Sequence, residues 1–141
     1  MSFYLDTSAI ISALIREGRT DSVHSWLASQ DPDALMISDW VVSEISAALS
    51  LKLRTREIDP PLRAAALASF QKQFADRLLV APVTPSHFRT AARFCDQHGL
   101  ELRAADALHL AVSADYGATL VTLDRILADS GAPLGVATLR L

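Results

Sequence analysis

The chain has 141 residues, half of them hydrophobic, and a formal net charge of −3. This size and composition predict one folded domain with its own core and exclude a disordered chain. The mild acidity gives no general electrostatic reason to expect nucleic-acid binding, which would need a local basic patch and a cation.

The first half of the chain alternates short apolar runs with amphipathic stretches. A buried strand over residues 3–5 ends at Asp6, and a helix is predicted over residues 9–16 with Gly18 as its stop. Asp6 suits a helix cap, and from this segment alone a cap and a functional acid explain it equally well. The further elements predicted here are a helix capped by Thr20 and Asp21, a loop over 29–33, a strand over 34–38 and a helix over 40–54 capped by Asp39.

The second half continues the alternation. Asp59, Pro60 and Pro61 predict the start of a helix that runs to about residue 76. Residues 102–125 predict a helix, a turn at Gly117 and a buried strand. The other elements predicted are a strand over 78–82, a helix from Thr84 with Phe88, Ala91, Ala92 and Cys95 facing inward, a short helix over 126–129 and a weak strand over 132–139 at a sheet edge. This order predicts an α/β fold, with a mainly parallel sheet of about four to five strands and helices on both faces.

The sequence carries no sign of membrane insertion or export. No apolar run approaches the roughly 20 residues that a membrane-spanning helix needs. The first residues lack the basic start of a signal peptide and already contain an acid. The single cysteine, Cys95, allows no internal disulfide and suits a reducing compartment. We therefore expect a cytoplasmic protein that does not contact the membrane.

Four acids occupy unusual places in the predicted fold. Asp6 and Asp124 end apolar strands, and Asp106 lies in the first turn of an almost wholly apolar helix. Glu44 borders the apolar face of its helix, where a carboxylate is costly unless it is paired. Because ligands of doubly wound α/β proteins bind outside the carboxyl ends of the strands, these acids can converge there. The alternative is that they are separate caps and surface residues.

If the four acids meet, their mutual repulsion requires a cation. Oxygen ligands without Cys or clustered His favour Mg²⁺ or Mn²⁺. Such a site suits phosphodiester hydrolysis, because the metal lowers the pKa of a bound water, polarises the phosphorus and stabilises the leaving oxygen. One acid can also serve as a general base.

Other motifs with an acid at a strand end fit less well. A phosphatase of the haloacid-dehalogenase type needs a second Asp at position 8, where Ser8 stands, and a metal-dependent adhesion site needs Ser at position 10, where Ile10 stands. No P-loop, G-x-G-x-x-G turn or G-x-S-x-G elbow is present. A phosphate-accepting signalling domain needs a lysine near the last strand, and no lysine follows Lys72.

Three motifs, in this order, resemble the PIN domain family and specifically the small VapC-type toxins of toxin–antitoxin pairs. They are FYLDTSAI near the start, SEISAAL around Glu44, and AADALHLAVSADYGATLVTLDR. The resemblance covers essentially the whole chain and implies a PIN-like three-layer sandwich forming a single domain over residues 1–141. It also implies a Mg²⁺- or Mn²⁺-dependent endoribonuclease that cuts RNA, forms a homodimer and is held inactive by a cognate antitoxin.

The resemblance also implies roles for individual residues. Thr7 and Ser8 are expected to orient the first acid through their hydroxyl groups. Thr122 is expected to contact the metal-binding residues without binding the metal itself. His109 matches a common histidine of the family, for which we favour packing or hydrogen bonding over metal binding. Leu127 stands where many relatives have an aromatic residue, which affects packing only. The implied catalytic and metal-binding acids are Asp6, Glu44, Asp106 and Asp124.

Contacts with RNA and with a partner protein are less clearly marked. The basic residues Lys52, Arg54 and Arg56 can touch RNA phosphates, although such a run is usually a solvated helix end. Arg103 can meet a phosphate or neutralise the acids when no metal is bound. Residues 40–74 predict two helices with spare apolar surface for an antitoxin helix, whose tail is expected to place an Arg among the acids. The alternative function is a catalytically inactive PIN-like module that binds RNA or protein.

Overall fold

The computed structural model describes all residues from 1 to 141, and a five-stranded sheet forms its centre. The strands lie in the order β3-β2-β1-β4-β5, and all four neighbouring pairs are parallel. This confirms the predicted α/β class and the edge position of the last strand. The strands are β1 (Phe3–Leu5), β2 (Leu35–Ser38), β3 (Leu79–Ala81), β4 (Thr119–Thr122) and β5 (Thr138–Arg140).

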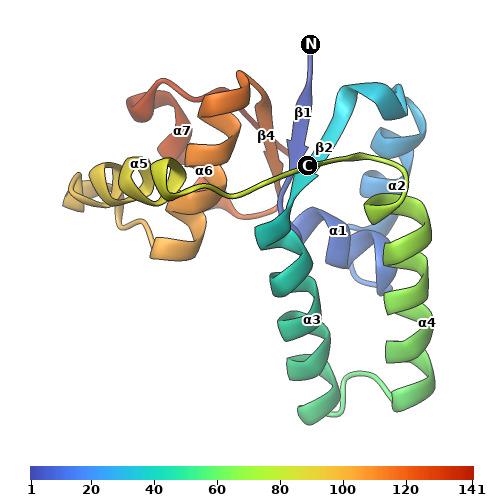
Figure 1. Ribbon diagram of the computed structural model, residues 1–141. Helices are drawn as coiled ribbons and strands as arrows, with labels where there is room; N and C mark the ends of the chain where they lie inside the picture. Colours follow the sequence, from blue (N-terminus) through green and yellow to red (C-terminus); the bar gives the residue numbers. More distant parts are fainter.

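Seven α-helices surround the sheet, and Figure 1 shows α1, α2 and α4 on one side of it and α5, α6 and α7 on the other. Helices α3 and α4 run antiparallel and project beyond the carboxyl ends of the strands as a hairpin (Figure 1). No helix combines the length and the apolar composition that crossing a membrane requires. The helices are α1 (Thr7–Leu14), α2 (Thr20–Ala28), α3 (Asp39–Arg54), α4 (Pro60–Phe70), α5 (Pro85–Cys95), α6 (Ala104–Tyr116) and α7 (Arg125–Gly131).

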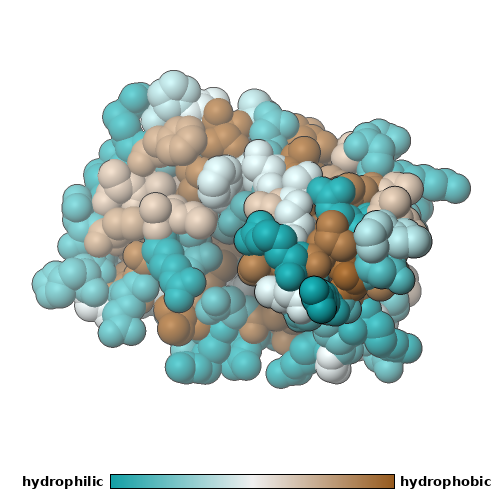
Figure 2. All heavy atoms as spheres, turned by 90° about the horizontal axis from the view of Figure 1, so that it is seen from below, coloured by the Kyte–Doolittle hydropathy of each residue, from teal (hydrophilic) through white to brown (hydrophobic).

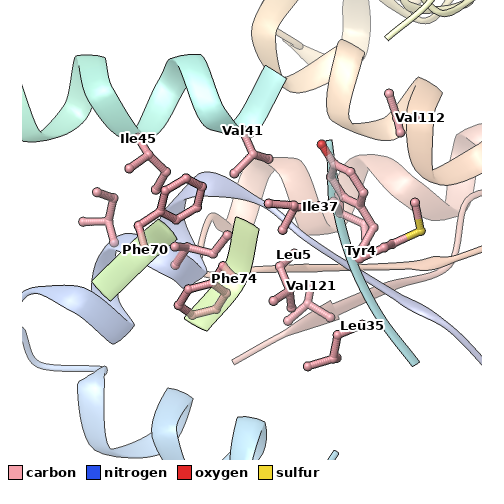
Figure 3. Close-up of a cluster of buried hydrophobic side chains, with 14 of the residues drawn as sticks. Tyr4, Leu5, Leu35, Ile37, Val41, Ile45, Phe70, Phe74, Val112 and Val121 are labelled. Carbon is pink, nitrogen blue, oxygen red and sulfur yellow. The ribbon is translucent and has the colours of Figure 1, made fainter. Parts of the chain in front are cut away.

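The core between the sheet and the hairpin fixes the base of α3. Figure 3 shows Val41 and Ile45 of α3 facing Phe70 and Phe74, with strand residues such as Ile37 beside them. The two phenylalanine rings stack with centroids 6.1 Å apart. Each such fully buried side chain contributes about 1.5–3 kcal/mol to folding. The core therefore holds the start of α3 firmly against the strand ends that precede the predicted acids.

The start of α4 follows the sequence closely. Asp59 caps α4 by accepting a hydrogen bond of 2.9 Å from the backbone N–H of Leu62, which confirms the predicted cap. A π-helical segment, Gln71–Ala75, continues the chain from α4 and ends next to the predicted boundary at residue 76. Three short 3₁₀ turns complete the structure, at Pro32–Ala34, His98–Leu100 and Ala132–Leu134.

Two predicted helix caps are not formed. Ser38 occupies the N-cap position of α3 and Asp39 is already helical; the Ser38 hydroxyl is bonded to Tyr4 rather than to the helix. Thr20 lies inside α2, and its buried hydroxyl donates to the backbone oxygen of Ser12 at 2.8 Å. Both side chains are used for tertiary contacts between elements, which a local cap pattern does not reveal.

The predicted inward face of α5 is partly wrong. Phe88 is 55% exposed and Ala92 is exposed, whereas His87 is buried. His87 bonds Asp115 of α6 through Nε2 at 2.9 Å, and its Nδ1 accepts from the backbone N–H of Thr84 at 3.0 Å. Because α5 packs on α6 through this histidine, the helix is rotated and Phe88 turns toward solvent.

The turn between α6 and β4 depends on a glycine. Gly117 has φ +61°, and no atom lies within 4 Å of a Cβ placed on it. Only backbone strain therefore opposes a side chain, and we expect Gly117→Ala to lower the free energy of unfolding by about 1 kcal/mol. The control is Gly18→Ala, which has equal space and no left-handed φ and should change stability by less than about 0.5 kcal/mol. Urea denaturation measures both variants, and equal losses would contradict the strain argument.

Candidate functional site

All four predicted acids line one pocket at the carboxyl edge of the sheet. Asp6 follows β1 and Asp124 follows β4, while Glu44 comes from α3 and Asp106 from the first turn of α6. The pocket has a volume of about 540 Å³. Figure 2 views the molecule from the side toward which the hairpin projects and shows mainly hydrophilic residues with hydrophobic patches between them. The other lining residues are Thr7, Ser8, Ile11, Glu17, Ala48, Lys52, His109 and Leu123.

Asp6 is the most deeply buried of the four acids, with 4% of its surface exposed. Its Oδ1 accepts hydrogen bonds from Ser8 Oγ at 2.7 Å and from the backbone N–H of Ala9 at 3.0 Å. Its Oδ2 accepts from Thr122 Oγ1 at 2.6 Å. Burial raises the pKa of Asp6 even though all three hydrogen bonds favour the charged form. Asp6 therefore does cap α1, and it also faces the pocket.

Glu44 is held by two side chains from other helices. Its Oε1 accepts from Thr7 Oγ1 at 2.7 Å and is hydrogen-bonded to His109 Nε2. Partial burial alone would raise the pKa of Glu44, but the interactions with His109 and Thr7 outweigh it and the pKa is lowered. Thr7 was expected to orient Asp6 and instead holds Glu44, because α1 packs against α3. His109 has the expected hydrogen-bonding role, with its other ring nitrogen 2.8 Å from the Tyr4 hydroxyl.

Asp106 and Asp124 are the more open pair. Asp106 is half-buried and accepts no hydrogen bond from the protein, whereas exposed Asp124 caps α7 by accepting from the backbone N–H of Leu127 at 2.9 Å. Burial raises the pKa of Asp106 first, and the negative charge of Asp124 raises it further, with smaller contributions from Glu44 and Asp6. The acids are thus close enough to repel one another.

Thr122 connects the first and last acids. Its buried hydroxyl donates to Asp6 and accepts from the backbone N–H of Asp124 at 3.0 Å. Ser8 Oγ accepts in turn from the backbone N–H of Leu123 at 3.0 Å. These bonds fix the carboxyl ends of β1 and β4 against each other, so Ser8 and Thr122 do lie directly behind Asp6.

The donor chemistry of the pocket fits a hard divalent cation. Glu44 Oε2, Asp124 Oδ2 and both carboxylate oxygens of Asp106 accept no hydrogen bond, while both ring nitrogens of His109 are engaged. As the side chains lie, however, no group of three or more His, Cys, Asp or Glu residues could hold a metal ion. Binding therefore requires the carboxylates to draw together, a movement that their repulsion opposes until a cation is present.

The basic residues predicted to contact RNA lie in different surroundings. Lys52 lines the pocket, but its Nζ is 2.9 Å from Glu17 and 3.5 Å from Glu57, so its charge is already paired. The other three are exposed and form no ion pair: Arg54, Arg56 and Arg103. Arg103 therefore does not neutralise the acids in this structure. Contact with RNA stays a prediction for all four.

Two residues behind the pocket were not singled out by the sequence. Tyr4 and Ser38 are strand residues whose hydroxyls bond each other at 2.8 Å, and Tyr4 also reaches His109. Both are completely buried. A tyrosine inside an otherwise apolar strand is the only sequence signal, and it does not indicate which residue the hydroxyl meets.

Comparison with known proteins gives one family and one fold. The model of the PIN domain family matches residues 3–132, and no curated protein sequence matches the chain. Among solved structures, the chain is similar to FitAcB from Neisseria gonorrhoeae, with 23% identity, a TM-score of 0.74 and coverage of 98% of this chain and 96% of that one. It is also similar to VapC20 from Mycobacterium tuberculosis, described as a sarcin-ricin loop cleaving toxin, with 22% identity, a TM-score of 0.74 and coverage of 99% and 100%. A third is VapBC2 from Rickettsia felis bound to promoter DNA, with 17% identity, a TM-score of 0.70 and coverage of 100% and 99%.

Proposed function

This chain belongs to the PIN domain family, and on that basis we propose that it is a divalent-metal-dependent endoribonuclease acting as the toxin of a toxin–antitoxin pair. The observation that carries the proposal is the single pocket that gathers Asp6, Glu44, Asp106 and Asp124. The fold that the chain shares with VapC20, a toxin that cleaves the sarcin-ricin loop, supports the same conclusion.

In this proposal the four acids would hold Mg²⁺ or Mn²⁺, and the ion supplies a more acidic water and stabilisation of phosphate charge. The chain's own residues do the rest. Thr7 and His109 hold one oxygen of Glu44, and Ser8 and Thr122 hold Asp6, so these two carboxylates keep their direction. Asp106 accepts no hydrogen bond from the protein, so its oxygens are free to accept a proton from an attacking water.

The proposed partners are RNA, a cognate antitoxin and a second copy of the chain. The α3–α4 hairpin exposes Val42, Leu51 and Leu62, which suits the apolar face of an antitoxin helix. The acidic pocket suits an arginine from the antitoxin tail. The homodimer rests on the family resemblance and on exposed Phe88, which lines an apolar hollow between α3, α5 and α6. The single free cysteine supports a cytoplasmic site of action.

The metal requirement is the direct test of this function. We expect EDTA to stop cleavage of RNA by the purified protein, and Mg²⁺ or Mn²⁺ to restore it, because the acids cannot approach one another without a cation. Without RNA, Mn²⁺ at about 100 times its Kd should stabilise the fold by about 2.7 kcal/mol, and KCl of equal ionic strength serves as the control.

The catalytically inactive module is the second candidate function. As the side chains lie, no group of three metal-binding residues is formed, which this module would also show. It predicts that RNA binds without being cut and that Mn²⁺ leaves the denaturation curve unchanged. Cleavage that persists in EDTA would instead contradict the metal site and leave a nuclease of another mechanism.

A further inference from the structure

A chain of buried hydrogen bonds connects the sheet to Glu44. The Ser38 hydroxyl lies 2.8 Å from the Tyr4 hydroxyl, which lies 2.8 Å from His109 Nδ1. His109 Nε2 is hydrogen-bonded to Glu44 Oε1. The four residues come from the end of β2, from β1, from α6 and from α3, so the chain joins four elements at one carboxylate.

The hydrogen bonds have a consistent direction. A carboxylate only accepts, so His109 Nε2 is the donor to Glu44. In the tautomer that carries its only ring proton on Nε2, Nδ1 is an acceptor and the Tyr4 hydroxyl donates to it. The Tyr4 oxygen is left to accept from Ser38. In this tautomer each bond points toward Glu44, and in a low-dielectric interior such bonds polarise and strengthen one another.

The position of Tyr4 indicates that its hydroxyl has a purpose beyond packing. Tyr4 is 0% exposed and His109 is 2% exposed, so an unpaired polar group here would be costly. Figure 3 shows the Tyr4 oxygen turned away from the neighbouring apolar side chains Leu35 and Val121. A tyrosine hydroxyl carries its proton at neutral pH and can donate it to a hydrogen bond. A phenylalanine would fill the same apolar space without this bond.

We propose that Tyr4, supported by Ser38, is a positioning residue that orients Glu44 through His109. By fixing the ring of His109 it fixes Glu44 Oε1, and it leaves Oε2, which accepts no hydrogen bond, for the pocket. The inference rests on the proposed function, in which Glu44 is a metal ligand. Groups that stand one step behind a metal ligand commonly change metal affinity by about 10–100-fold.

The test is the affinity for Mn²⁺ without RNA, followed by the electron paramagnetic resonance signal of the free ion. Tyr4→Phe keeps the ring and removes one oxygen, and we expect it to raise the Mn²⁺ Kd about tenfold. The matched control is Thr138→Val, which removes a hydroxyl that donates to the backbone oxygen of Ala128 at 2.8 Å and lies outside the pocket lining. Its Kd should stay within about twofold of the wild-type value, within ordinary scatter for a distant site.

A second variant identifies the route of the effect. If Tyr4 acts through His109, then Tyr4→Phe should change the Kd less than about twofold in a His109→Gln background, so the two effects are not additive. Additive effects would overturn the route through His109. A wild-type Kd in Tyr4→Phe would overturn the inference and leave the proposed function intact. A wild-type protein that binds no Mn²⁺ would refute the proposed function, and the inference would fall with it.

Discussion

Asp106→Asn is expected to lower kcat/KM for RNA cleavage by about 10²–10⁴-fold while making the metal-free protein more stable. Activity falls because the substitution removes the one acid whose two oxygens are both unused by the protein. Unchanged cleavage with Mg²⁺ present would remove the enzymatic function that we propose.

The stability gain follows from the direction of the pKa shift. Burial and the charge of Asp124 raise the pKa of Asp106 in the folded protein above its ordinary value of 3.8. Between these two pKa values the folded state binds more protons than the unfolded chain, so stability falls as pH rises through this window. At pH 7 the ionised Asp106 therefore destabilises the metal-free protein, and Asp106→Asn removes that charge.

Urea denaturation in EDTA measures this difference. We expect Asp106→Asn to unfold at a higher urea concentration than the wild type at pH 7, and the difference to vanish below the ordinary carboxyl pKa. Asp129→Asn is the control, because Asp129 is exposed and only weakly paired with Arg125, so its loss should change stability by less than about 1 kcal/mol. A destabilised Asp106→Asn at pH 7 would show that charge repulsion does not dominate the pocket.

The sequence predicted the elements better than their packing. Apolar runs that end in an acid located β1 and β4, and the Asp59-Pro60-Pro61 signal located the start of α4. The buried face of α5 could not be predicted in this way, because its alanines permit either of two faces of the helix to pack inward. The contact of His87 with Asp115 determines which face is buried. Helical periodicity depends on the sequence of one helix alone, whereas the face of that helix that is buried depends on the helix that packs against it.

The same limit applies to the pocket. An acid at the end of a strand can be recognised locally, but Asp6 and Asp124 share an edge only because β1 and β4 are neighbours, and this order is a property of the whole sheet. The bond between Tyr4 and His109 joins residues 105 positions apart. The family resemblance pointed to His109, whereas the tyrosine in an apolar strand gave no indication of the residue that the Tyr4 hydroxyl contacts. Supporting residues are therefore harder to predict than the acids they support.

Substitutions of Asp6 test its hydrogen bonds as well as its charge. Both Asp6→Asn and Asp6→Ala are expected to abolish cleavage, because each removes a proposed metal ligand from the centre of the pocket. Both also remove the buried charge whose cost is visible in the raised pKa of Asp6. Both variants lack the charge, and only Asp6→Asn keeps an oxygen for the donors around Asp6.

We expect Asp6→Ala to be less stable than Asp6→Asn by about 2–4 kcal/mol. The asparagine oxygen can still accept from Ser8 and from the backbone N–H of Ala9, and the Thr122 hydroxyl can turn to accept from the asparagine amide. Alanine takes the acceptor away from all three donors, at about 1 kcal/mol for the lost helix cap and about 1–3 kcal/mol for a buried unsatisfied donor.

Urea denaturation of the two metal-free variants at pH 7 gives this difference directly, because the effect of charge cancels between them. Equal stability of Asp6→Ala and Asp6→Asn would mean that the bonds to Ser8, Ala9 and Thr122 do not hold the strand ends together. Cleavage retained by Asp6→Asn would show that the negative charge of Asp6 is not needed, and the metal would then have to rest on Glu44, Asp106 and Asp124 alone.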